Sequence, residues 1–251
     1  VISRALAVIA TLAFVYAQEK PWSWRSFDPS TMTSLLRYGG WVTVSSVISP
    51  ILTSLDQFVI GSTLGVAAVS YYVVPMNLVM RTQVVAAALS RAVFPSMSRM
   101  DPAESKAVSE DMTDVLGIGL CALCAPAIIV VHPLIDLWIS PAFGAAAGPV
   151  AEILLLGGWI NSIAFIPYSY LQAKGRPDLV AKLHLAEVLP YAVLLFYLSS
   201  TFGILGAAVA WSARVTVDAG LMFLAARMSP ARIANLLVPG AFMLVSYACA
   251  R

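Results

Sequence analysis

Long apolar runs dominate this sequence, and they limit the possible folds more than any other feature. Short breaks separate the runs, which occupy approximately residues 1–17, 35–60, 66–93, 113–139, 150–171, 179–201, 204–228 and 233–250. A helix needs about 20 apolar residues to cross the hydrocarbon core of a bilayer, and most of these runs reach that length. They are too long and too evenly apolar for the alternating strands of a membrane barrel. The sequence therefore predicts an all-α, polytopic transmembrane helical bundle of about eight spans.

The scarcity of charge supports the same class. Only 11% of the 251 residues are charged while 60% are apolar, and the mean hydropathy is +0.85. A typical soluble domain carries roughly 25% charged residues, so this chain has too few polar groups to cover a surface that faces water. Soluble enzymes, disordered chains and nucleic-acid binders are excluded on this ground. We expect membrane lipid as a partner and no nucleic acid.

The breaks between the runs carry residues that end helices and form turns. They contain Glu19-Lys20-Pro21, Gly61 to Gly65, Asp101-Pro102, Ser140-Pro141, Lys174 to Pro177, Phe202-Gly203 and Ser229-Pro230. Eleven of the fifteen Lys and Arg residues lie in or beside every second break, while breaks 61–65, 140–149 and 202–203 contain none. Basic residues collect on the cytoplasmic side of membrane proteins. The first, third, fifth and seventh breaks are therefore predicted to be cytoplasmic, and the others face outward.

Two arginines fall about halfway along predicted spans. Arginine at the centre of a bilayer costs at least about 2.5–3.5 kcal/mol on insertion scales, so each should face a cavity or a partner. Arg81 has no acidic residue within helical reach, which favours an interior filled by water or ligand. Arg214 lies four residues before Asp218, so a neutralised structural pair is as good an interpretation as a cavity residue.

Acidic residues also occur at depth. Asp56, Glu187 and Asp218 lie within predicted spans. Asp56 fits either a site for a coupling ion or a hydrogen bond to a neighbouring helix. Glu187 shares a helix face with His184, which fits either a proton or cation relay or an ordinary hydrogen-bonded pair. These alternatives stay open at the level of sequence.

The sequence contains no recognisable motif for catalysis, metal binding or cofactor binding. Cys121 and Cys124 are one turn apart inside an apolar helix, with no second pair or convergent His, so they read as small packing residues. The sequence contains no phosphate-binding G-x-x-x-x-G-K-[ST] loop and no H-E-x-x-H or G-x-S-x-G motif. We expect no catalytic residue, no metal site and no cofactor.

Several segments carry a family resemblance. They read YGGWVTVSSVISPILTSLDQFVI at 38–60, GSTLGVAAVSYYVVPMNLV at 61–79, RAVFPSMSRM at 91–100, FIPYSYLQAKGRPDLVAKLHLAEVLPY at 165–191 and FGILGAAVAWSARVTVDAG at 202–220. In order and spacing they resemble the C-terminal half of polysaccharide (O-antigen type) flippases. These belong to the multidrug/oligosaccharidyl-lipid/polysaccharide exporter superfamily. The resemblance extends over residues 35–228.

The resemblance implies an architecture and an activity. Such flippases have two six-helix lobes and move a polyprenyl-pyrophosphate-linked oligosaccharide across the bacterial inner membrane, for O-antigen or exopolysaccharide biosynthesis. On this mapping 1–17 is the truncated last helix of the first lobe, and 18–34 is a cytoplasmic linker. Residues 35–228 form the six-helix C-terminal lobe, and 233–251 form part of one further helix. We therefore expect the chain to be a fragment whose partner is the N-terminal lobe.

Site residues follow from combining the resemblance with the buried charges. Arg81 and Arg214 are the candidates for binding the pyrophosphate, because guanidinium groups match phosphate oxygens. Asp56, Glu187 and Asp218 are the candidates for ion coupling. A sugar path would use Gln83 and Asn161, and aromatic residues that could line it are Tyr71, Tyr72, Trp159 and Tyr168.

Two other functions fit parts of this sequence. A multidrug or other small-molecule, cation-coupled exporter of the same superfamily is the main alternative, although its cavity would be expected to be acidic rather than arginine-bearing. A polymerase or ligase of envelope glycans would carry a large outward loop for its chemistry. The outward breaks here have at most about ten residues, so we do not expect an enzyme.

Overall fold

Helices make up the regular structure of the computed structural model, which describes residues 2–18 and 28–251. In chain order they are α1 (Ile2–Gln18), α2 (Pro29–Leu64), α3 (Val66–Arg99), α4 (Pro102–Trp138), α5 (Pro141–Ala173), α6 (Pro177–Ala225), α7 (Pro230–Asn235) and α8 (Leu237–Ala250). Neither described segment contains a strand, so the all-α prediction is confirmed. The chain divides into two units, 1–39 and 40–251.

Proline marks the start of most helices. α2, α4, α5, α6 and α7 each begin at a proline. Its ring fixes φ near the helical value, and the N–H that it lacks has no partner in a first turn anyway. The predicted breaks at Asp101-Pro102, Ser140-Pro141 and Ser229-Pro230 are confirmed, whereas Glu19-Lys20-Pro21 lies outside the described residues.

In the first unit the start of α2 is capped by an acidic side chain. Thr31 and Ser30 donate hydrogen bonds to the Asp28 carboxylate from their hydroxyl and backbone N–H groups. These hydrogen bonds, first among them the one from the Thr31 hydroxyl, lower the pKa of Asp28. Residues 29–34 of the predicted linker 18–34 belong to α2, and residues 19–27 lie outside the described part, so the cytoplasmic linker stays a prediction.

Six of the described helical segments are long and apolar enough to cross a membrane. They are α2, α3, α4, α5, α6 and the segment Pro230–Ala250, which joins α7 and α8. The count of eight spans is not confirmed. α1 coincides with the predicted run 1–17 but is not among the six, and α6 contains both predicted spans 179–201 and 204–228.

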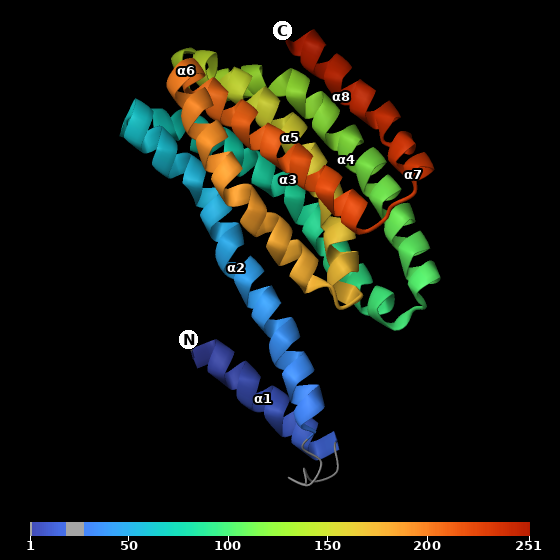
Figure 1. Cartoon of the computed structure of the whole chain (residues 1–251). Helices are drawn as coiled ribbons and strands as arrows, with labels where there is room; N and C mark the ends of the chain where they lie inside the picture. The colour runs from blue at the N-terminus through green and yellow to red at the C-terminus, as the bar shows by residue number, and fades with distance from the viewer. Residues whose placement is uncertain (1, 19–27) are drawn as a thin grey trace. The chain divides into compact units, whose positions relative to one another are not determined.

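α6 reverses direction within its length. Gly203 has a φ of 64°, a value that glycine adopts readily and other residues rarely do, and the helix is kinked there. Figure 1 shows the two legs of α6 running back along each other on either side of this turn. Gly206 lies so close to the backbone carbonyl of Leu198 that no side chain fits between them. The predicted break at Phe202-Gly203 is therefore a tight reversal between two helical legs.

The connections of the second unit alternate between its two ends, as the charge pattern predicts. At one end Lys174 Nζ donates to the Met100 carbonyl at 2.9 Å, and Ser229 N donates to Glu110 Oε1 at 2.7 Å. These contacts bring the third, fifth and seventh breaks together. At the other end the rings of Tyr71 and Phe143 lie 4.8 Å apart, which joins the second and fourth breaks. Which end faces the cytoplasm stays a prediction.

The helices extend beyond the predicted runs. α4 begins at Pro102 rather than 113, and α3 continues to Arg99 rather than 93. The added turns carry charged residues such as Glu104 and Lys106. Apolar runs mark only the part of a helix that suits hydrocarbon, so they underestimate helices that project from a bilayer.

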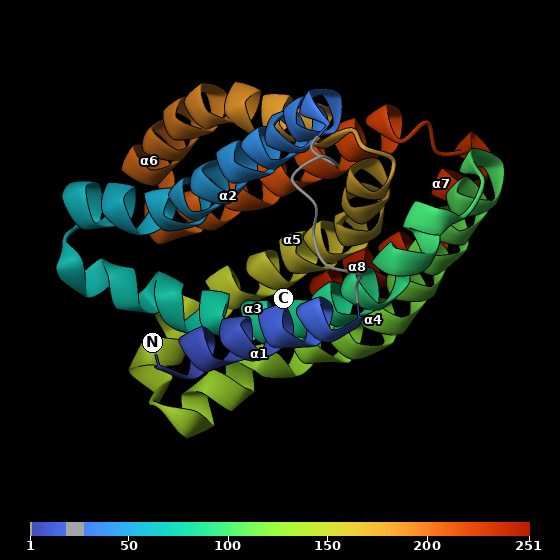
Figure 2. The same ribbon diagram turned by 90° about the horizontal axis from the view of Figure 1, so that it is seen from below.

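α5 lies at the centre of the second unit. It packs against α3, α4 and α6, and Figure 2 shows it between α4 and α6. Gly157 and Gly158 permit this close packing, because a methyl group would collide with Trp211 at the first and with Val79 at the second. Trp159 Nε1 donates to the Gly117 carbonyl on α4 at 2.9 Å. The central helix is thereby fixed on both sides, and α8 covers α4 from outside.

Candidate functional site

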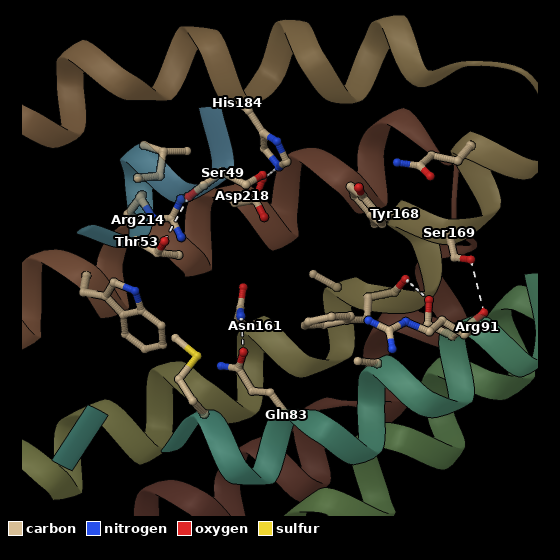
Figure 3. A pocket seen from close by; sticks show the side chains of 18 of the residues that line it. Ser49, Thr53, Gln83, Arg91, Asn161, Tyr168, Ser169, His184, Arg214 and Asp218 are labelled. Atoms are coloured by element: carbon tan, nitrogen blue, oxygen red, sulfur yellow. Dashed lines mark hydrogen bonds and ion pairs between the residues drawn. The ribbon is translucent and has the colours of Figure 1, made fainter. Parts of the chain in front are cut away.

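A polar cavity of about 620 Å³ lies between α2, α3, α5 and α6, entirely within the second unit. Its polar lining consists of Ser49, Thr53, Gln83, Ser90, Arg91, Asn161, Tyr168, Ser169, Gln172, His184, Arg214 and Asp218 (Figure 3). Leu52, Met80, Ala87, Phe94, Ala164, Phe165 and Trp211 supply the apolar lining. Polar groups inside a bundle of membrane-length helices are costly unless water or a ligand meets them. This cavity is therefore the candidate functional site.

An amide pair spans the middle of the cavity. Asn161 Nδ2 on α5 donates to Gln83 Oε1 on α3 at 3.1 Å, so the structure brings together the two residues predicted for a sugar path. Gln83 is 6% exposed, and its Nε2 has no hydrogen-bond partner among the described residues. This buried donor is available to whatever occupies the cavity.

Serine hydroxyls bind α3 to α5 at one end of the cavity. Ser90 Oγ donates to the Phe165 carbonyl at 3.2 Å, and Ser169 Oγ donates to the Ser90 carbonyl at 3.3 Å. Arg91 follows directly on α3 and lines this same end, together with Tyr168 (Figure 3). The helices that carry Arg91 and Tyr168 are thus held in a fixed relation.

Four titratable side chains of α6, three of them buried and Arg214 partly buried, pair between its two legs. Arg214 Nη1 lies 3.7 Å from Glu187 Oε2, and His184 Nε2 lies 3.8 Å from Asp218 Oδ1. Helical spacing had suggested Arg214 with Asp218 and His184 with Glu187, and both suggestions are wrong. The reversal at Gly203 sets the two legs side by side, so partners across the legs replace partners along one leg.

Asp56 connects this group to two further helices. Its carboxylate accepts hydrogen bonds from the hydroxyl of Tyr72 on α3, at 2.6 Å, and from the hydroxyl of Tyr191 on α6. The Arg214 guanidinium lies over the Tyr191 ring, 5.3 Å from its centre. Asp56 was predicted either to hydrogen-bond to a neighbouring helix or to bind a coupling ion. The structure contains the hydrogen bonds, and the coupling ion stays a prediction. We call Asp56, His184, Glu187, Arg214 and Asp218 the charged cluster.

The charged cluster holds more acid than base. Its three carboxylates face one guanidinium and one imidazole. Both oxygens of Glu187, Nε of Arg214 and Nδ1 of His184 are buried without a hydrogen-bond partner within the described part of the chain. No three metal-binding side chains converge in that part either. A proton, a cation or a ligand hydroxyl would satisfy groups that have no hydrogen-bond partner in the described part.

The two predicted cavity arginines lie in different surroundings. Arg214 lines the cavity, but its guanidinium is paired with Glu187. Arg81 is exposed and does not line this cavity, so its predicted role stays a prediction. Arg91 lines the cavity instead, although its place near a predicted helix end indicated only topology. Helical periodicity contained the signal, because Gln83, Ala87, Ser90 and Phe94 share its helix face.

Of the four aromatic residues predicted for the sugar path, the structure places only one in the cavity lining. Tyr168 lines the cavity, and its ring stacks on His184 with the centroids 6.2 Å apart. Tyr71, Tyr72 and Trp159 do not line this cavity. Tyr71 contacts the Phe143 ring, and Tyr72 and Trp159 donate the hydrogen bonds to Asp56 and to the Gly117 carbonyl. Trp211, which the sequence analysis did not select, lines it. Cys121 and Cys124 are buried free thiols, as expected of packing residues.

Comparison with known proteins gives two matches. Residues 1–148 match the model of a family described as "Polysaccharide biosynthesis protein". Over 226 residues the chain is 30% identical to a protein of Shigella flexneri named "Putative O-antigen transporter", a match that covers 88% of the chain and 53% of that protein. The chain thus spans about half the length of this relative. No solved structure matches.

Proposed function

The chain belongs to the polysaccharide biosynthesis protein family, and from this membership we propose that it forms part of a transporter for a polyprenyl-pyrophosphate-linked oligosaccharide. The transporter would flip this lipid across the bacterial inner membrane during O-antigen or exopolysaccharide biosynthesis. One observation carries the proposal: a cavity of about 620 Å³, lined by both polar and apolar side chains, lies between helices long enough to cross a membrane.

The chemistry of the cavity suits a ligand that is both hydroxylated and anionic. Side-chain amides of Gln83 and Asn161 can donate to and accept from sugar hydroxyls. Guanidinium groups bind phosphate oxygens through planar, paired donors. The apolar outer faces of the same helices suit the polyprenyl chain, which would stay in the bilayer.

Flipping requires that the site open to one side of the membrane at a time, and we propose alternating access for this purpose. A second lobe would correspond to the part of the Shigella flexneri relative that this chain does not match. Asn77 and Arg81 are exposed polar residues in the middle of α3. An arginine at this depth is costly against lipid, so we propose that this face of α3 borders the other lobe.

The charged cluster is our candidate for ion coupling. Asp56, Glu187 and Asp218 outnumber the basic groups around them, so the cluster can take up a cation or a proton at modest cost. Asp56 lies on α2 and Glu187 and Asp218 lie on α6, so a change in occupancy would alter the attraction between these helices. We propose that Arg214 organises this cluster.

A second candidate function has an observation in its favour. The excess of carboxylates in the charged cluster suits a small organic cation, as in a multidrug or other cation-coupled exporter. Arg91, which has no ion pair among the residues described, opposes this reading because it adds positive charge to the same cavity.

Deleting the gene and restoring it distinguishes the two functions. Loss of the transporter should abolish surface polysaccharide and leave its lipid-linked precursor in the cytoplasmic leaflet, and the intact full-length gene should restore export. Resistance to cationic dyes should not change. Normal surface polysaccharide in the deletion strain, together with increased dye sensitivity, would contradict the proposal and support the exporter.

A further inference from the structure

The polar cavity is electrically uneven along its length. Figure 3 shows Arg91 and Ser169 toward one end, the Gln83–Asn161 pair in the middle, and Arg214 with Thr53 toward the other end. Each region offers a different chemistry to a bound molecule. An elongated ligand with one charged part and one neutral part should therefore bind in a single direction.

The Arg91 end is suited to an anion. The structure gives Arg91 no ion pair with any acidic residue in 28–251, so its positive charge is uncompensated there. Ser169 lies toward the same end of the cavity (Figure 3), and Gln172, one turn further along α5, also lines the cavity. A guanidinium with neighbouring polar groups provides the donors that phosphate oxygens need.

The Arg214 end is unsuited to an anion, although it also contains an arginine. Glu187 pairs with Arg214 at 3.7 Å, and the Asp218 carboxylate lines the cavity nearby. Asp56 adds a third carboxylate, which reaches Arg214 through the Tyr191 ring. A phosphate placed here would meet more negative than positive charge, and this repulsion disfavours its binding at the Arg214 end.

The middle of the cavity is suited to a neutral sugar. Gln83 lies two turns before Arg91 on α3, which is about 12 Å along the helix axis. Its Nε2 is a buried donor without a partner in the described residues, and Asn161 holds the amide in place at 3.1 Å. Trp211 lines the same cavity and offers an aromatic surface against which a sugar ring can pack.

We propose that the cavity binds a glycosyl pyrophosphate in one orientation, with the pyrophosphate at Arg91 and the first sugar at the Gln83–Asn161 pair. This rests on the proposed function and specifies which part of the substrate each region holds. Under the predicted topology the Arg91 end is cytoplasmic. The sugar therefore enters the membrane ahead of the pyrophosphate.

Affinity measurements on the purified full-length protein test the two contacts separately. The probes are inorganic pyrophosphate, geranyl pyrophosphate and geranyl pyrophosphate that carries one N-acetylglucosamine. Arg91→Ala should weaken the binding of all three about tenfold, since it removes a charged hydrogen-bond donor. Arg91→Lys should recover part of the loss, and Arg99→Ala, on the same helix outside the cavity, should have no effect. Gln83→Leu should weaken only the sugar-bearing probe, by about fivefold.

Protection of single cysteines tests the direction itself. In a background with Cys121, Cys124 and Cys249 replaced by Ala, Phe94→Cys reports on the Arg91 end, and Met80→Cys reports on the region beyond Gln83. Geranyl pyrophosphate should slow the labelling of Phe94→Cys by a soluble maleimide and leave Met80→Cys reactive. The sugar-bearing probe should protect both positions.

The outcomes separate this inference from the function on which it rests. Protection of Met80→Cys but not Phe94→Cys by the sugar-free probe would overturn the proposed orientation. Binding that protects neither position would also overturn it, because the ligand would then lie elsewhere in the protein. Failure of the wild-type protein to bind the sugar-bearing probe would overturn the proposed function as well. Protection of Phe94→Cys by inorganic pyrophosphate as well would support the contact of the pyrophosphate itself, rather than the lipid, with Arg91.

Discussion

At the scale of individual residues, the Asp56 carboxylate of α2 links this helix by hydrogen bonds to α3 and α6. It is 1% exposed, and the hydroxyls of Tyr72 and Tyr191 donate to it from two other helices. A buried charged or polar group destabilises a protein unless it is hydrogen-bonded, so each donor matters more here than it would at a surface. The position of α2 therefore depends in part on two phenol groups, beside the core packing of Leu52 and Ile60.

Removing one of these donors should destabilise the protein measurably. Tyr72→Phe keeps the ring and deletes the hydrogen bond to Asp56, and should lower the free energy of unfolding by about 1.5–3 kcal/mol. Denaturant titration of the purified protein in detergent measures this change. Tyr71→Phe is the matched control, because Tyr71 is the adjacent residue and its ring contact with Phe143 survives the substitution. Equal losses in the two variants would contradict the role given to Asp56.

At the scale of elements, the two legs of α6 create the charged cluster. Without the reversal at Gly203, Glu187 and Arg214 would lie 27 positions apart on one straight helix. The closeness of the legs depends on Gly206, whose missing side chain lets the Leu198 carbonyl approach. A backbone feature near one end of the bundle thus determines which charges meet in its interior.

Substitutions of two glycines in the second leg of α6 should have opposite effects. Gly206→Ala forces the legs apart and should destabilise the protein by about 1–3 kcal/mol, the usual cost of overpacking. Gly220→Ala meets open space and should stabilise it by roughly 0.5–1 kcal/mol through a smaller loss of backbone entropy. Thermal unfolding of both variants measures the difference. If Gly206→Ala were as stable as the wild type, the legs would not be in contact at this point.

The elements themselves could largely be predicted from the sequence. Proline and glycine fix backbone angles locally, so Asp101-Pro102, Ser140-Pro141 and Phe202-Gly203 mark their turns without help from the fold. Charge pairing could not be predicted in the same way. Arg214 had a partner four residues away on its own helix, and only the geometry of the reversal decides in favour of Glu187.

The site could be predicted in part for a related reason. Polar residues in apolar surroundings are conspicuous, so Gln83, Asn161 and the members of the charged cluster were all selected from the sequence. Arg91 was not, because a basic residue near a predicted helix end is equally expected from topology alone. Arg81 was selected for its depth, yet depth does not define which side of a helix faces the cavity.

At the scale of the whole second unit, the charges and the connections agree on two distinct ends. The basic breaks are brought together by Lys174 with Met100 and by Arg232 with Asp111, the latter at 2.6 Å. The breaks without Lys or Arg lie at the opposite end (Figure 1). The distribution of Lys and Arg between the two ends of a membrane protein determines which end stays in the cytoplasm during insertion.

Accessibility of introduced cysteines in intact cells should reveal this orientation. In a background without native cysteines, Ser62→Cys, Ala142→Cys and Thr201→Cys should react with a maleimide that cannot cross the inner membrane. Ser98→Cys and Ala231→Cys should react only after the membrane is made permeable. All five positions are exposed in the structure, so burial does not limit labelling. The reverse pattern would place the Arg91 end of the cavity outside the cell.

A ligand that binds in the cavity between α2, α3, α5 and α6 must also displace the water that fills it. At ~30 Å³ for each water molecule, its volume of about 620 Å³ corresponds to roughly 20 waters. A ligand that fills the cavity returns these waters to the bulk, so its affinity depends on water activity. Osmolytes too large to enter should tighten binding, and the slope of log Kd against osmolality then counts the waters that each transported molecule displaces.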